Sequence, residues 1–381
     1  MKKLIAISVM LVLLTGAAFA QISGDLFVNA ALLAGNTEAD DIMMGGKGSN
    51  DIYGAKWSLT FGEAPGTGRI VWRLHDASMW GWFAWRPIDM LRIKLGWDRD
   101  GEFGTAQING WGFTAGAKDL VATNDYAGGL FMSSAGRGSP WYDGFGDGEG
   151  YSFIVSLYPM EGLQINVGIP QFANTAAEMS RKIANVQASI FYNIEDIGRL
   201  SLAFVGRGGL GKDQDKTMSV GDIKASFFLT ALDSIRIDLG FSMGIPFTNA
   251  SDKSEGGRMA IGLGFNMPTV VENVSFKLRG GAFVGGTNAA GAALNTVIMV
   301  GILPTYQIAP GFRFYFHAGM GMEMPETGDS NMGWFVNPYI SYRAGGITFW
   351  AGLKVDAPNS IGTAQQKAIN WSVPFGFSAN Y

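Results

Sequence analysis

The side chains with the most chemistry to offer are cations that recur at every second position within short apolar segments. Arg92 and Lys94, for example, alternate with Leu91, Ile93 and Leu95. Because successive side chains of a β-strand point to opposite faces, such a segment has one apolar face and one basic face. The cations that share this polar phase are Lys56, Arg69, Arg73, Arg92, Lys94, Lys224, Arg236, Arg258, Lys277, Arg279, Arg313 and Lys354, against mainly Asp222 and Asp238 as acids. A confined wall of this charge would concentrate anions beside it.

The same alternation extends over most of the chain and indicates many strands of about 9–11 residues, the length that crosses a bilayer at a tilt. The residues from Trp371 to Tyr381 alternate strictly, with apolar or aromatic side chains at the odd positions. A large soluble β-sandwich also alternates. The absence of charge from these apolar faces favours lipid contact, because a lipid-facing Arg or Lys costs about 2–4 kcal/mol at the bilayer midplane.

Short turns and longer polar connections follow one another in alternation along the chain. Tight turns with Gly, Pro, Asp or Asn occur near residues 64–66, 159–162, 195–198 and 309–311, while longer stretches, mostly rich in Gly, lie between them. This arrangement is typical of membrane barrels, whose short turns face the periplasm and whose long loops face outward. We therefore predict a single all-β, antiparallel transmembrane barrel of about 18 strands, within a range of about 16–20.

Composition and the first residues place this barrel outside the cytoplasm. Lys2 and Lys3, an apolar run and the Ala18-Phe19-Ala20 site predict a signal peptide over residues 1–20 and a barrel over residues 21–381. The predicted location is the bacterial outer membrane. Without Lys2 and Lys3, the 28 basic residues become 26 against 32 acids, a net charge of −6 that argues against a nucleic-acid partner.

No metal, cofactor or catalytic site is predicted. The chain has no Cys and two His, His75 and His317, which lie far apart in the sequence. Acidic, glycine-rich stretches between residues 98 and 149 could contact Ca²⁺, yet neither forms an EF-hand loop. We expect no enzyme, with a hydrolase that uses His75 or His317 as base as the minor alternative.

The aromatic final strand together with the signal peptide resembles bacterial outer-membrane β-barrels. The stretch from Trp85 to Gly96, followed by Asp100-Gly101-Glu102-Phe103-Gly104, is similar to porin-like outer-membrane proteins of spirochaetes. The porin resemblance implies a homotrimer and a third external loop that folds into the pore. Residues 98–148 match that loop in position and charge, and its constriction acids would be Asp98, Asp100, Glu102, Asp125, Asp143 and Asp147. An ordinary surface loop is the alternative for this segment.

These features predict a passive diffusion channel whose partners are outer-membrane lipid and small hydrophilic solutes, anions above all. The basic face is also what any solvated inner wall would show, because a barrel must keep its charges inside. The alternative function is a surface adhesin or structural barrel that acts through its external loops. A transporter of hydrophobic solutes would need an apolar lumen patch and an N-terminal plug, and few residues precede the first predicted strand.

Overall fold

The computed structural model describes residues 21–37, 43–44, 52–63, 65–73, 79–97, 151–170, 186–206, 221–232, 234–245, 259–286, 293, 295–357 and 369–380. Within them the chain forms one sheet of 21 antiparallel strand segments. No helix in this part of the chain is long and apolar enough to cross a membrane. The segments are β1 (Gln21–Asn36), β2 (Met43–Met44), β3 (Ile52–Phe61), β4 (Gly66–Arg73), β5 (Met79–Ile88), β6 (Leu91–Trp97), β7 (Tyr151–Met160), β8 (Leu163–Pro170), β9 (Gln187–Ile194), β10 (Gly198–Gly206), β11 (Gly221–Leu232), β12 (Ile235–Ile245), β13 (Met259–Val271), β14 (Val274–Val284), β15 (Thr296–Ile302), β16 (Thr305–Ala309), β17 (Phe312–Met324), β18 (Asn331–Ala344), β19 (Ile347–Gly352), β20 (Lys354–Ala357) and β21 (Asn370–Asn380).

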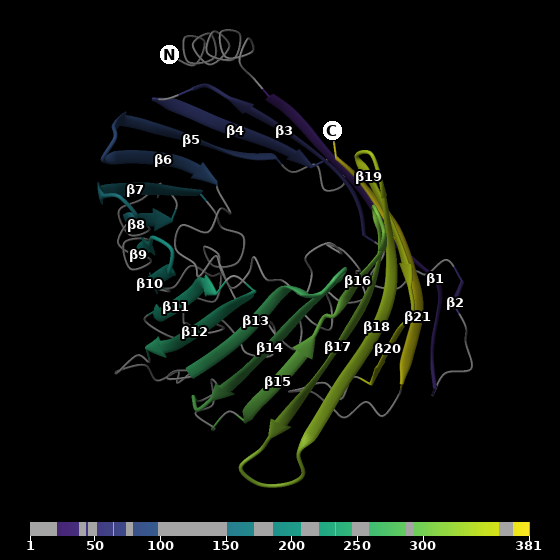
Figure 1. The fold of residues 1–381 in the computed structure, drawn as a ribbon. Helices are drawn as coiled ribbons and strands as arrows, with labels where there is room; N and C mark the ends of the chain where they lie inside the picture. Colours follow the sequence, from purple (N-terminus) through teal and green to yellow (C-terminus); the bar gives the residue numbers. More distant parts are fainter. Residues whose placement is uncertain are drawn as a thin grey trace.

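The sheet closes on itself, because β1 pairs with β3 on one side and with β21 on the other. Figure 1 shows the strands following one another around this closed wall, with the first and last strands side by side. Closure leaves no free sheet edge, which is what a lipid environment requires of a β-structure. The predicted all-β barrel is confirmed.

Three interruptions account for the difference between 21 segments and the predicted 18 strands. β15 and β16 both pair with β14 and β17, so they are two halves of one strand. β19 and β20 likewise both pair with β18 and β21. The two residues of β2 only extend the pairing of β1. The ring of antiparallel neighbours described here therefore contains 18 strands.

Exposure alternates along the strands as their sequences predict. In β17, Tyr315, His317, Gly321 and Glu323 are buried, whereas the residues between them are more exposed. Large apolar side chains such as Ile261 (55% exposed) and Phe349 (47%) lie on the outer face. Buried Ser156, Asn166 and Ser189 lie on the inner face. An apolar exterior and a polar interior are the two faces of a membrane barrel.

The short turns gather at one end of the barrel, and the strands that enter five of them carry a bulge. The register shifts lie after Trp85, Leu157, Leu229, Met267 and Gln307. Two of the turns place a non-glycine residue at positive φ, Asp196 (58°) and Asn273 (64°), the residue types that tolerate this conformation best. Gln21 pairs with Thr60 and Asp25 with Asn380, so both ends of the barrel wall lie at the short-turn end.

Several predictions fall outside the described residues. They are the signal peptide over residues 1–20, the loop over residues 98–148 with its acids Asp98, Asp100, Glu102, Asp125, Asp143 and Asp147, the cation Arg258, and His75. For these the sequence-based expectations stay predictions.

Candidate functional site: the inner wall

Every predicted wall cation within the described strands lies on the inner face. Cross-strand register sets this face for Lys56, Arg73 and Lys224, and the side chains show it for Arg69, Arg92, Lys94, Arg236, Lys277, Arg279, Arg313 and Lys354. These side chains differ in access. Lys94, Arg279 and Lys354 are only 3%, 5% and 7% exposed, whereas Arg236 and Arg313 are exposed. A role in lining a solute path stays a prediction for all of them.

The inner face carries more acids than the sequence pattern indicated. Register places Asp25 opposite Lys56 and Asp356 opposite Phe335, on the same face as Asp222 and Asp238. Glu323 is also on this face, 6% exposed, and accepts a hydrogen bond from Asn295 Nδ2 at 2.8 Å. The cations still outnumber the acids, because Arg199 and Arg343 join the inner face as well. The field of this wall is therefore positive but not uniform.

Arginines are concentrated at the short-turn end of the wall. Arg92, Arg199, Arg236 and Arg313 are each the second residue of the strand that follows a short turn. The other four strands that follow a short turn carry Thr67, Gln164, Ser275 and Thr348 as their second residue. All eight side chains share one level of the inner wall, and four of them are guanidinium groups. We call these four residues the mouth arginines.

Sequence reasoning missed Arg199, although a signal for it was present. Its guanidinium carbon lies 4.2 Å from the ring centroid of Phe191, a buried inner-wall residue of β9. In each of four strands, a short turn is followed by one strand residue and then by an arginine. These arginines are Arg92, Arg199, Arg236 and Arg313. Comparison of the strands after their turns would therefore have identified Arg199.

Small polar side chains form a hydrogen-bonded row across β6 to β9. Arg92 Nη2 donates to Ser156 Oγ at 3.2 Å, and Ser156 lies opposite Asn166 in the sheet. Asn166 accepts from Gln164 Nε2 at 2.8 Å and donates through Nδ2 to Ser189 Oγ at 2.9 Å. Asn166 and Ser156 are 0% exposed and Ser189 is 2% exposed, so these bonds satisfy groups that water does not reach. We call Arg92, Ser156, Asn166 and Ser189 the polar row.

The inner wall opposite the polar row carries aromatic side chains instead. The rings of Tyr315 and Tyr339 stack at 4.5 Å with an interplanar angle of 6°, and His317 meets the edge of Phe335 at 4.8 Å. These rings and Trp350 form what we call the aromatic cluster of β17 to β19, and each is at most 9% exposed. Two glycines make room for it. A Cβ at Gly319 would lie 2.7 Å from the Phe335 ring, and one at Gly352 would lie 2.6 Å from Tyr339 Cβ.

Asn337 lies between these rings and is 0% exposed, with His317 as its cross-strand partner on β17. Among the described residues, neither its Oδ1 nor its Nδ2 has a hydrogen-bond partner. Trp350 Nε1 is buried without one in the same part of the chain. An unsatisfied buried amide is costly, so this side of the wall is less well satisfied than the polar row.

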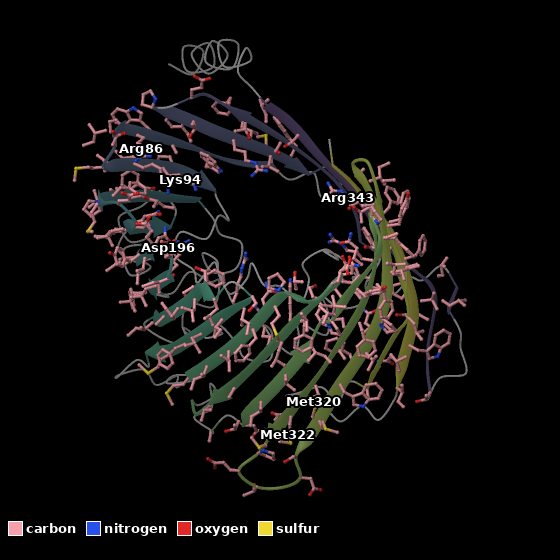
Figure 2. The ribbon with its side chains drawn as sticks, in the orientation of Figure 1. Arg86, Lys94, Asp196, Met320, Met322 and Arg343 are labelled. Carbon is pink, nitrogen blue, oxygen red and sulfur yellow. The ribbon has the colours of Figure 1, made fainter. Side chains whose placement is uncertain are left out.

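A pocket of about 410 Å³ lies at the short-turn rim of β5 to β9. Arg86 lines it, donates through Nη2 to the Asp89 carbonyl oxygen at 2.6 Å, and lies 4.9 Å from the Tyr158 ring centroid. Figure 2 shows Arg86 on β5 and Asp196 in the turn between β9 and β10, with Arg343 of β18 on the other side of the barrel. Glu161, Gln164 and Asn193 complete the polar part of this lining.

Comparison with known proteins supports the architecture. No protein-family model matches the sequence, and no curated protein matches it at the sequence level. Solved structures do match. The anion-selective porin of Comamonas acidovorans has a TM-score of 0.55 at 10% identity and covers 95% of this chain and 99% of its own. OpdO of Pseudomonas aeruginosa has a TM-score of 0.54 at 11% identity over 95% and 97% of the two chains, and OpdL of the same organism has 0.53 at 10% identity over 96% and 99%.

These likenesses extend over nearly the whole of each chain, and at such identity they establish the fold. The protein has the fold of bacterial outer-membrane β-barrel porins. The predicted porin-like barrel is thereby confirmed, and the match supports the predicted location in the bacterial outer membrane.

Proposed function

We propose that this barrel is a passive, non-enzymatic channel of the outer membrane for small hydrophilic solutes, and that its cationic inner wall favours anions. The observation that carries the proposal is the ring of mouth arginines, four guanidinium groups at one level of the wall. Guanidinium groups stay charged at any physiological pH, so the field at this level is permanent. A ring of one charge in a water-filled passage lowers the entry barrier for counter-ions.

The outer and inner faces support the same proposal from two directions. The outer side chains are apolar and fit a lipid partner. Away from the aromatic cluster, the inner wall carries many polar and charged side chains, which offer hydrogen bonds to hydrated solutes. The anion-selective porin of Comamonas acidovorans has the same fold, which makes anion selectivity a natural use of such a wall. The homotrimer stays an expectation from the porin resemblance.

Liposome swelling tests the channel itself. Liposomes that contain the refolded protein should swell in an isotonic solution of a small neutral sugar, whereas liposomes without protein should not. The matched control is the same protein inserted after heat unfolding, because it holds composition constant while removing the barrel. Folded protein that gives no swelling would overturn the channel and favour the alternative, a barrel that acts through its external loops.

A further inference from the structure

Three cations of β12 and β14 lie close to one another on the inner wall. Arg236 lies opposite Asn266 of β13, which in turn lies opposite Lys277 of β14. Arg279 is on the same face of β14, two residues beyond Lys277. Arg236 and Arg279 both lie close enough for their charges to act on the Lys277 ammonium group. We call Arg236, Lys277 and Arg279 the basic cluster.

The members of the basic cluster have different access to a solute. Arg236 is exposed and Lys277 is half-buried, so their charged ends face the interior of the barrel. Arg279 is only 5% exposed and supplies a fixed charge behind them. Its cross-strand neighbours on β13 and β15 are Gly264 and Gly301. The cluster is thus a recessed basic patch with two accessible ends.

The charge of this patch matches a doubly charged anion. Three like charges at close range repel one another, and a bound anion relieves that repulsion. The two accessible ends, Arg236 and Lys277, supply one positive charge for each charge of a dianion. Asn266, between Arg236 and Lys277, adds an amide that donates or accepts a hydrogen bond.

We propose that the basic cluster is a binding site for a small dianion, such as a dicarboxylate or an inorganic oxyanion with two charges. The inference rests on the proposed channel, because it takes the inner wall as the surface that solutes meet. It goes beyond a diffuse positive field, which would attract anions of any structure. A diffuse field also favours the higher valence, whereas a discrete site makes that preference depend on the residues of the basic cluster.

The test compares succinate with butyrate, two four-carbon acids that differ by one carboxylate. In planar bilayers, succinate should block the chloride current of the refolded protein at about tenfold lower concentration than butyrate, a difference of about 1.4 kcal/mol. Sulfate is a smaller dianion than succinate and is tested in the same way. A block by sulfate alone would assign the site to inorganic oxyanions. Equal block by succinate, sulfate and butyrate would overturn the site.

Two variants locate the effect. Lys277→Gln and Arg236→Gln should each reduce the succinate preference to near that of butyrate. Arg313→Gln is the matched control, because it removes the same charge at the same strand position on β17, outside the cluster. It should lower anion selectivity and leave the ratio of succinate to butyrate unchanged. Loss of that ratio in Arg313→Gln as well would show a diffuse field and overturn the site.

Calorimetric titration of the detergent-solubilised protein separates this inference from the proposed function. If the wild type binds succinate and Lys277→Gln does not, the site is supported even without conductance. In that case only the proposed channel function would be wrong. Conductance with no valence preference and no binding heat would keep the channel and overturn the site.

Discussion

Two asparagines, Asn166 and Asn337, occupy equivalent places on two sides of the barrel but differ in the hydrogen bonding of their side-chain amides. Both lie on the inner wall, and both are 0% exposed. Asn166 uses both ends of its amide, accepting a hydrogen bond from Gln164 and donating one to Ser189 of the polar row. Asn337 lies among aromatic rings and, within the described residues, has a hydrogen-bond partner on neither end. A buried polar group on this wall is therefore not always hydrogen-bonded. The small polar side chains of β6 to β9 stabilise their part of the wall by hydrogen-bonding to one another.

The largest expected effect concerns the glycines that accommodate the aromatic cluster. Gly352→Val should prevent or strongly weaken folding, because a Cβ there would lie 2.6 Å from both the Pro338 carbonyl oxygen and Tyr339 Cβ. Overpacking of this kind costs about 1–3 kcal/mol, and contact with backbone gives no room to relax. The measurement is the fraction of protein that keeps the fast-migrating folded band in unheated gel samples.

Gly319→Ala provides the internal control for this prediction. Its Cβ would meet first a side chain, the Phe335 ring at 2.7 Å, while the nearest backbone atom, the Val300 carbonyl oxygen, would lie at 3.2 Å. Adding Phe335→Leu should therefore restore the folded band to Gly319→Ala. If Gly352→Val folds like the wild type, the close packing described for the aromatic cluster is wrong.

The next prediction concerns the stability effect of replacing each of the two asparagines by leucine. Asn166→Leu should lower the free energy of unfolding by about 1–3 kcal/mol, because it leaves half-buried Gln164 and buried Ser189 without their partner. Asn337→Leu, which removes an unsatisfied amide, should be neutral or stabilising by up to about 1 kcal/mol. Urea unfolding in liposomes measures both. Equal destabilisation by the two substitutions would remove the distinction between the two sides of the wall.

The mouth arginines give an effect on selectivity rather than stability. Replacing Arg92, Arg199, Arg236 and Arg313 together by Gln should shift the permeability ratio towards cations, because it removes four permanent charges at one level. The control replaces Thr67, Gln164, Ser275 and Thr348, the neutral residues of the same level, by Ala. A shift of equal size in that control would contradict an electrostatic origin.

The smallest effect belongs to the contact of Arg199 with Phe191, an aromatic ring beside the polar row. A double-mutant cycle with Arg199→Gln and Phe191→Leu should give a coupling free energy of about 0.5–1 kcal/mol, since the guanidinium carbon lies 4.2 Å from the ring centroid. Additive effects of the two substitutions would show that the contact contributes nothing to stability.

The sequence was sufficient for the barrel because its signal is local. Alternation determines the face of each residue. The short turns contain residues that tolerate a tight reversal of the chain, such as Asp196 and Asn273. The count of 18 strands follows from those turns, and the interruptions near Leu303 and Leu353 do not change it. The short-turn positions of Arg92, Arg236 and Arg313 could also be read from the sequence.

The parts that escaped prediction depend on which strands become neighbours and how their side chains pack. The stacking of Tyr315 on Tyr339 and the row from Arg92 to Ser189 need the register between strands, which alternation alone leaves open. The extra inner acid Asp25 was missed because its strand alternates less regularly in sequence, whereas Asp356 continues the polar phase of Lys354 and could have been found from it. Burial of Lys94 and Arg279 depends on packing across the wall and has no local signature.

The reversal potential of the refolded wild-type protein in a planar bilayer tests whether this channel favours anions. Under a KCl gradient, we expect stable conductance steps with a reversal potential of the sign set by chloride. A reversal potential of the sign set by potassium, from a correctly folded barrel, would contradict this expectation.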